Sequence, residues 1–239
     1  MFGGWSTLVP WAMATEEARI GLIVGANTFR EPTLTAKIAT TLDHVSGGRA
    51  ILGIGAAWFE TEHTAFGFDF GDGFPERLRW LGEALPVMCG MLHGERPTAA
   101  GPRYHATAVR NDPPPIQQRL PILVGGGGEK VREKERILVE HCERESRDPA
   151  EIERTTGIGT VIIRDSRAEA EKAATAIFEH NGSAPQRLDQ PGATPEDLVE
   201  QLAPYGTIGY RHLIAGFPAP YDEESMTRLI TEVKPKLEA

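Results

Sequence analysis

Three side chains that can carry protons follow one strongly apolar stretch of the chain. The run Ala50–Ile54 is followed by "GAAWFETEH", which supplies Glu60, Glu62 and His63. Carboxylates and imidazoles are common general acids and bases in enzymes. Their E-x-E-H spacing differs from the zinc-binding HExxH pattern, and no second cluster of metal-ligating residues is evident. We therefore predict acid–base chemistry here and no metal site.

The same residues also fit a structural role. Acidic side chains are favourable near a helix N-terminus because they complement the helix dipole. For Glu62 we favour this interpretation. Glu60 and His63 fit either interpretation equally well, so they are the candidate catalytic residues.

Several apolar segments end in very small residues. These ends are Gly25 with Ala26, the stretch 53–57, and the glycine run 125–128. Ligands of α/β proteins bind at the carboxyl ends of parallel strands. One glycine-rich turn alone is better explained as a flexible loop, but three such ends in one chain favour a ligand site.

The glycine run continues as "GGGGEK" into helical sequence. Backbone amides at such a helix start can hold a phosphate. The run matches neither the dinucleotide-binding GxGxxG pattern nor the P-loop. The stretch 53–57 is followed by Trp58 and Phe59. These two aromatic side chains either pack in the core or contact a ring-shaped ligand.

Other polar residues are predicted to be structural. His44, beside Asp43 at a helix C-terminus, suits the helix dipole, and His212 reads as a hydrogen-bonded core histidine. Cys89 and Cys142 lack ligand or redox spacing. They fit a reduced, cytoplasmic compartment.

Alternating strands and helices must position these residues. Strands are expected at residues 18–24, in the "RAILGIG" stretch from Arg49, at 121–130, at 155–163 and at 210–217. Helices are expected at residues 33–45, 76–92, 131–146, 166–180, 194–202 and 223–237, and an irregular link at 94–120. Continuously apolar strands that alternate with helices indicate the α/β class.

Bulk composition excludes several functions. The 239 residues carry 25 basic and 34 acidic side chains, a net charge of −9. This balance argues against nucleic acid or an anionic membrane surface as the main partner. No apolar run is long enough to cross a membrane. The expected partner is a small-molecule substrate, and a second copy in a homodimer is the assembly considered.

The stretch "IGLIVGANTFREPTLTAKIATTLDHVSGGRAILGIGAAWFETEH" resembles the luciferase-like monooxygenase superfamily. It is most similar to the branch that uses the deazaflavin coenzyme F420, through "TLDHVSGGR" and "LGIGAAW". The resemblance continues through "PILVGGGGEK", "TPEDLVEQL" and "HLIAGFPAPYD". It implies a (β/α)8 TIM barrel with a flavin or deazaflavin at the carboxyl ends of the strands.

The resemblance also implies roles for individual residues. Val24, Gly25 and Ala26 correspond to a strand-end bulge behind the cofactor ring, and Ala56 and Ala57 to cofactor contacts. The phosphate-binding turn corresponds to Gly126, Gly127, Gly128 and Glu129. Trp58 stands where some relatives carry a proton-accepting glutamate, so Glu60 or His63 would have to replace it.

Two losses relative to the family pattern are expected. A strand–helix–strand at the N-terminus and an internal helix–strand between Lys130 and Val131 are missing, which leaves about five of eight barrel strands. We therefore expect residues 1–239 to form one incomplete barrel domain, and the chain to be a truncated or internally deleted member.

The function implied is hydride transfer between reduced F420 and a small organic substrate. Two alternatives stay open: an FMN-dependent monooxygenase of the same family, and a non-catalytic remnant. Cofactor preference distinguishes the first alternative, and absence of cofactor binding by folded protein indicates the second.

Overall fold

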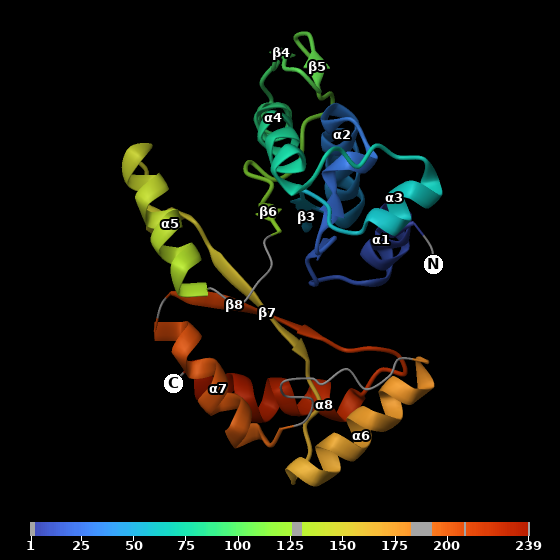
Figure 1. Cartoon of the computed structure of the whole chain (residues 1–239), viewed down its shortest axis with the longest axis vertical. Coiled ribbons are helices and arrows are strands. Elements are labelled where there is room, and N and C mark those ends of the chain that lie inside the picture. The colour runs from blue at the N-terminus through green and yellow to red at the C-terminus, as the bar shows by residue number, and fades with distance from the viewer. Residues whose placement is uncertain (1–2, 126–130, 183–192, 208, 239) are drawn as a thin grey trace. The chain divides into compact units, whose positions relative to one another are not determined.

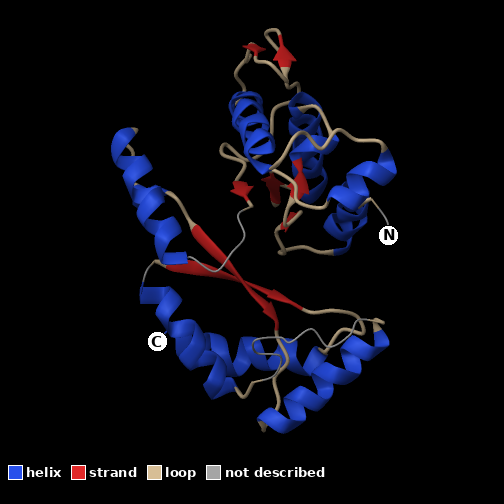
Figure 2. Cartoon of the chain, viewed as in Figure 1, coloured by secondary structure: helices blue, strands red, loops and turns tan. Residues whose placement is uncertain are grey.

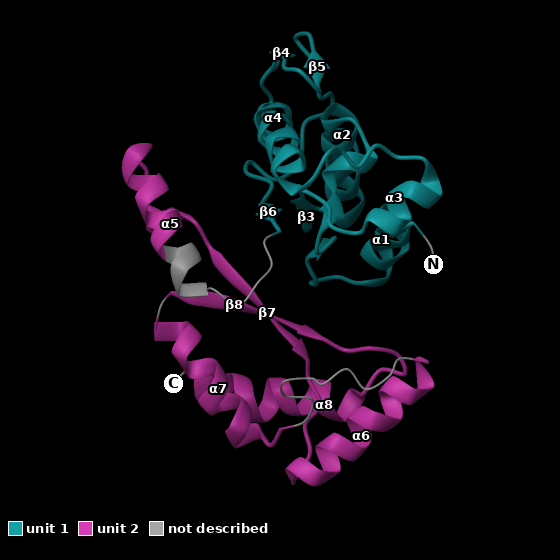
Figure 3. Cartoon of the chain, viewed as in Figure 1, with its two compact units in different colours: residues 1–128 teal, residues 129–239 magenta. Residues whose placement is uncertain are grey.

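The computed structural model describes residues 3–125, 131–182, 193–207 and 209–238 of the chain. They form two compact units, residues 1–128 and 129–239, each with its own hydrophobic core (Figure 3). The predicted phosphate-binding turn, Gly126–Gly128 with Glu129, lies outside the described residues.

The first unit is built on a parallel sheet with β3 (Ala50–Gly55) in its middle. β3 pairs with β6 (Ile122–Val124), with β1 (Ile20–Gly21) and with β2 (Gly25–Ala26). β1 and β2 pair with opposite ends of β3, so they are the two halves of one interrupted strand. One continuous strand was predicted at residues 18–24. The structure has β1 within these bounds, an interruption after Gly21, and β2 beyond them.

Helices cover this sheet, and α2 and α4 lie side by side (Figure 1). The helical elements are α1 (Gly4–Ala14), the 3-10 turn η1 (Asn27–Phe29), α2 (Pro32–Ser46), α3 (Glu60–Phe66) and α4 (Phe74–Leu92). α2 begins with Pro32 and ends at Gly47, whose φ of 66° is the left-handed conformation that glycine tolerates. The core between helices and sheet includes Leu42, Leu52 and Met88.

Helix α1 and a short hairpin of the first unit were not predicted. α1 carries Pro10 in its interior and lacks a side-chain N-cap, so local sequence signals are weak. It is held instead by packing of its buried residues Trp5, Leu8 and Ala12. The predicted irregular link contains a short antiparallel hairpin, β4 (Ala99–Ala100) with β5 (His105–Ala106), so the link was only partly irregular.

The second unit pairs β7 (Arg154–Thr160) with β8 (Tyr210–Gly216) in parallel (Figure 2). Its helical elements are α5 (Val131–Arg144), η2 (Pro149–Glu151), α6 (Arg167–His180), α7 (Pro195–Thr207), α8 (Glu223–Arg228), the π-helical turn η3 (Leu229–Val233) and α9 (Lys234–Glu238). α6 starts with the predicted capping box, since the Ser166 hydroxyl accepts from the Glu169 amide and donates to its carboxylate.

The α/β class is confirmed, and all five predicted strands are present. Within the described residues, the pairing joins β1, β2, β3 and β6 in one sheet and β7 with β8 in another, with no pairing that closes a barrel. Whether the chain forms one incomplete barrel domain therefore stays a prediction.

Candidate functional site

A bulge interrupts the strand that is formed by β1 and β2. Gly21 pairs with Ile51 and Gly25 with Ile54, so this strand uses one residue more than β3 over the same distance. The residues between β1 and β2 leave the ladder, and the Ile23–Val24 peptide is cis. A strand-end bulge was predicted at Val24 to Ala26. In the structure the bulge takes in residues 22–24, and Gly25 and Ala26 are paired with β3 in β2.

Glycine residues opposite the bulge make room for it. A Cβ at Gly53 would lie 1.7 Å from the Leu22 carbonyl oxygen. A Cβ at Gly55 or Gly125 would lie 2.8 Å or 2.4 Å from Val24 Cγ2. Side-chain carbon atoms cannot approach so closely. Gly53 of β3 is therefore explained by the backbone of the bulge, and Gly55 by the Val24 side chain.

Apolar side chains are exposed in the bulge and where β3 and β6 end. Ile23 in the bulge is 69% exposed, Val124 at the end of β6 is 53% exposed, and Trp58 after β3 is 84% exposed. The Trp58 ring lies 5.2 Å from that of Phe59. Ile23 and Val124 were not singled out from the sequence, because apolar residues in strands are normally read as core.

The loop after β3 contains two further predicted cofactor contacts. Ala56 is buried, and Ala57 has a φ of 69°, an unusual left-handed conformation for a residue with a side chain. Glu60 and Glu62 then lie in the first turn of α3, and Glu60 is exposed. The predicted Trp58 and Glu60 thus both face solvent, on the same short segment.

His63 is placed differently, because it is only 1% exposed. Its Nδ1 lies 2.8 Å from the Phe59 carbonyl oxygen, and its Nε2 lies 2.6 Å from the Thr28 hydroxyl oxygen. A carbonyl only accepts, so Nδ1 donates, and the Nε2 of a neutral ring accepts from Thr28. Both nitrogens of this candidate catalytic residue are therefore engaged in hydrogen bonds. Its catalytic role stays a prediction.

Aromatic rings pack against His63. The rings of Phe29 and Phe70 have centroids 4.6 Å from the imidazole, on η1 and on the loop before α4 respectively. The guanidinium of Arg77, a buried residue of α4, stacks on Phe70 at 3.7 Å. Packing of this kind fixes the orientation of the imidazole. The sequence could have indicated it only through the density of phenylalanine between residues 59 and 74.

A second buried contact follows β2 directly. The Asn27 side-chain amide donates to the Tyr104 hydroxyl oxygen at 3.0 Å, and both residues are buried. Burial raises the pKa of the Tyr104 phenol. Asn27 and Thr28 together anchor the chain after β2, one toward the segment of the hairpin and the other toward α3.

The opposite end of β3 carries the motif "TLDHVSGGR". Asp43, 0% exposed, accepts hydrogen bonds from the Gln117 backbone amide and side-chain amide. The Arg49 guanidinium donates to the carbonyls of Ala12, Thr15, Ala18 and Ser46 and to the Thr15 hydroxyl. This motif therefore ties α1, α2 and the link before β6 together. His44 was predicted to be structural, and its Nε2 lies 2.8 Å from the Pro114 carbonyl oxygen.

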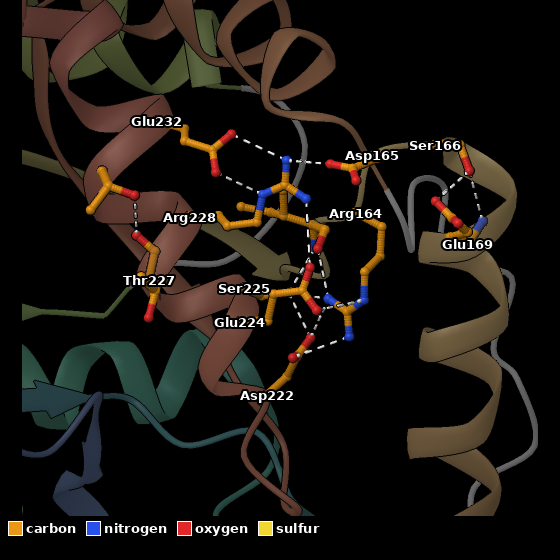
Figure 4. A network of polar contacts seen from close by, with 12 residues as sticks. Arg164, Asp165, Ser166, Glu169, Asp222, Glu224, Ser225, Thr227, Arg228 and Glu232 are labelled. Carbon is orange, nitrogen blue, oxygen red and sulfur yellow. Dashed lines mark hydrogen bonds and ion pairs between the residues drawn. The ribbon is translucent and has the colours of Figure 1, made fainter.

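The second unit has a dense polar network between the end of β7 and α8 (Figure 4). The Arg164 guanidinium donates to both carboxylate oxygens of Asp222, at 3.0 and 3.2 Å. The buried Ser225 hydroxyl donates to Asp222 and accepts from the Ile163 amide. Every one of these contacts is made within the network, so we interpret it as a structural tie.

This network predicts a dependence of stability on pH. Burial alone would raise the pKa of Asp222, but hydrogen bonds from Arg164 and Ser225 hold it below the ordinary value. A lowered pKa stabilises the fold above the unfolded value and loses that contribution as pH falls through the folded value. We expect Asp222→Asn to cost about 1–3 kcal/mol at pH 7. The difference from wild type should shrink at pH 3 in urea unfolding.

Asp165→Asn is the matched control, because Asp165 is an exposed partner of Arg228 in the same network. We expect it to cost less than about 1 kcal/mol at either pH. A difference between wild type and Asp222→Asn that grows toward low pH would contradict the prediction.

His212 was predicted to be a core histidine, and this prediction is wrong. Its side chain is exposed on β8, and its Nδ1 lies 2.6 Å from a Glu153 carboxylate oxygen. β8 pairs with β7 but with no other described strand, so much of its surface is open to solvent.

The part of the chain that the structure describes contains no cluster of three or more histidine, cysteine or acidic side chains that could hold a metal ion. No helix in this part has both the length and the apolar character needed to span a membrane.

Known proteins match the chain over half of its length or more. A "putative coenzyme F420-dependent oxidoreductase" of Mycobacterium tuberculosis is 31% identical over 138 residues, which are 53% of this chain and 39% of that protein. An "F420-dependent glucose-6-phosphate dehydrogenase" of Microbacterium testaceum is 27% identical, over 96% of this chain and 82% of its own. The chain thus spans well under half of the first protein and most of the second.

Solved structures show the same fold. The F420-dependent tetrahydromethanopterin reductase of Methanopyrus kandleri superposes with a TM-score of 0.76 at 17% identity, over 99% of this chain and 88% of its own. The monooxygenase RslO1 of Streptomyces bottropensis superposes with a TM-score of 0.78 at 16% identity. The match covers 98% of this chain and 82% of that protein. The family model for luciferase-like monooxygenases matches residues 4–134, which include β1, β2, β3, β6 and the bulge between them. The chain belongs to the luciferase-like monooxygenase family.

Proposed function

We propose that this protein is an oxidoreductase that binds F420 at the carboxyl ends of β2, β3 and β6. Hydride would pass between reduced F420 and a small organic substrate. The observation that carries the proposal is the exposure of Trp58 and Val124 where β3 and β6 end, together with that of Ile23 in the bulge before β2. Exposed apolar groups at this edge of a parallel sheet suit a flat ring. Relatives and a structural neighbour named for F420 support the same cofactor.

The residues present fit a ring-shaped group. The bulge brings Val24 to the sheet edge. Gly55 and Gly125, which lie opposite, leave room for its side chain. Ala56 and Ala57 carry only methyl side chains, and Trp58 adds an exposed aromatic face. In the proposal Val24, Gly25, Ala26, Ala56, Ala57 and Trp58 face the ring, and Gly126, Gly127, Gly128 and Glu129 hold the phosphate.

The cofactor, when bound, supplies the hydride chemistry. The chain's own residues bind and orient it, and the apolar groups keep water away from the reacting face. Glu60 is exposed two residues after Trp58 and can hold or move a proton at its carboxylate. His63, with both nitrogens hydrogen-bonded inside the unit, is less suited to proton exchange with a substrate.

Two observations favour a second candidate, a member of the family that has lost catalysis. The described residues contain no pairing that closes a barrel. The alignment with an F420-dependent glucose-6-phosphate dehydrogenase of Amycolatopsis mediterranei, 22% identical, extends over 284 residues while taking in 96% of this 239-residue chain. It must therefore open gaps within this chain, which supports the proposed internal deletion.

Turnover with each cofactor tests the proposal. Purified protein is mixed with oxidised F420 and a panel of secondary alcohols and sugar phosphates, and in parallel with reduced FMN and oxygen. The proposal is supported if the absorbance of oxidised F420 falls only when one class of substrate is present. Glu60→Gln should reduce the rate of this F420 reduction about 100-fold or more. Oxygen-dependent product formation with FMN alone would favour the monooxygenase. Activity with neither cofactor would favour the remnant.

A further inference from the structure

We propose that His63 is a positioning residue, which acts through its hydrogen bond to Thr28 to hold the loop Ala56–Phe59 and with it Trp58. This inference rests on the proposed function for the role of Trp58 toward a ring. The geometry that carries it is independent of that function. One imidazole connects the segments that follow two neighbouring strands.

The first step of the argument is the place of the two partners. β2 and β3 are adjacent, since Ala26 pairs with Gly55. Thr28 follows β2 within η1, and Phe59 ends the loop that follows β3. The His63 ring reaches the Thr28 hydroxyl at 2.6 Å and the Phe59 carbonyl at 2.8 Å. It therefore fixes the distance between the two strand ends.

The second step is the tautomer that this geometry selects. Nδ1 must donate to the Phe59 carbonyl, so of the two neutral tautomers only the Nδ1–H form makes both contacts, with Thr28 donating to Nε2. Phe29 and Phe70 hold the ring on its sides. A ring so enclosed cannot turn without losing both hydrogen bonds.

The third step is the consequence for Trp58. Its side chain is 84% exposed, so packing alone does little to fix its direction. Phe59, the next residue, is anchored by His63, and Ala57 before it adopts a left-handed conformation. The anchor thus sets where the backbone of Trp58 lies and which side the indole presents. Preorganised contacts of this kind raise affinity by lowering the cost of ordering.

Thr28→Val tests the tie with nearly unchanged side-chain shape, and Thr28→Ser restores the hydroxyl. The protein is labelled with 5-fluorotryptophan, and the Trp58 fluorine resonance is assigned with Trp58→Phe. We expect Thr28→Val to shift the Trp58 resonance and to leave that of Trp11 unchanged, and Thr28→Ser to keep the wild-type position. F420 affinity should fall about tenfold in Thr28→Val and recover in Thr28→Ser.

Asn27→Ala is the matched control, because it removes the neighbouring contact to Tyr104 without touching His63. It should leave the Trp58 resonance in place. A Trp58 resonance that is unchanged in folded Thr28→Val, or that moves equally in Asn27→Ala, would overturn the proposal.

A second measurement needs only the wild-type protein. Nitrogen chemical shifts of histidines labelled with nitrogen-15, with His63 assigned from His63→Gln, report the tautomer. The Nδ1–H form is expected, and the Nε2–H form would overturn the proposal. Should wild type bind neither F420 nor FMN, the proposed function fails, while the fluorine and nitrogen signals still decide whether His63 positions the loop.

Discussion

Replacing Gly53 by alanine is expected to unfold the first unit. The added Cβ would lie 1.7 Å from the Leu22 carbonyl oxygen, and that oxygen belongs to the backbone of the bulge. The backbone of this bulge is held at both ends by paired strands, so it cannot move aside as a flexible side chain can. We expect a loss of more than about 3 kcal/mol of unfolding free energy, a large part of the stability of a small domain. Urea unfolding followed by circular dichroism measures it.

Gly82→Ala provides the comparison. Gly82 lies in α4, and a Cβ there would meet no atom within 4 Å. Because alanine favours helix more than glycine does, this variant should gain up to about 1 kcal/mol. If Gly53→Ala were as stable as wild type, the close approach of the bulge to β3 would be wrong, and with it the explanation of the glycines.

The second large effect is expected at Arg49. Its guanidinium donates to four carbonyls and one hydroxyl from three segments of the first unit, including the C-terminal turns of α1 and α2. Helix C-termini carry carbonyls without partners in the helix, so these acceptors would be left unsatisfied. We expect Arg49→Met to cost about 3–5 kcal/mol. Thermal and urea unfolding give the measurement.

Arg49→Lys should recover part of the loss, since an ammonium keeps the charge but lacks the planar fork. Arg79→Met is the matched control. The Arg79 side chain is 69% exposed, and its contact with Glu76 is long, at 4.0 Å. Loss of the Arg79 guanidinium should therefore cost under about 1 kcal/mol. Equal effects at Arg49 and Arg79 would show that the "SGGR" arginine has no special structural role.

The elements with strong local signals were predictable from the sequence. α2 has an apolar face, Pro32 at its start and Gly47 at its end, and α6 has the Ser166 capping box. α1 has none of these signals and forms because Trp5 and Leu8 pack on the core. Tertiary packing of this kind overrides local preference and cannot be read from one sequence.

The candidate site was predictable as a place but not as a geometry. Glycine and alanine at the strand ends pointed to the carboxyl edge of the sheet. Gly53 is needed because the Leu22 carbonyl, which is distant in sequence, lies against it. The sequence does not show this neighbour, so the glycine was interpreted as making room for a ligand. His63 likewise looked equivalent to Glu60 until the structure placed Thr28, 35 positions away in sequence, against it.

The most direct test of the function is equilibrium binding of F420 and of FMN to the same folded preparation. Quenching of cofactor fluorescence is followed over a titration with wild type and with Trp58→Ala. Saturable binding that prefers F420 and weakens at least tenfold in Trp58→Ala is the predicted result. Absence of saturable binding of either cofactor by protein that unfolds cooperatively would contradict the proposed function.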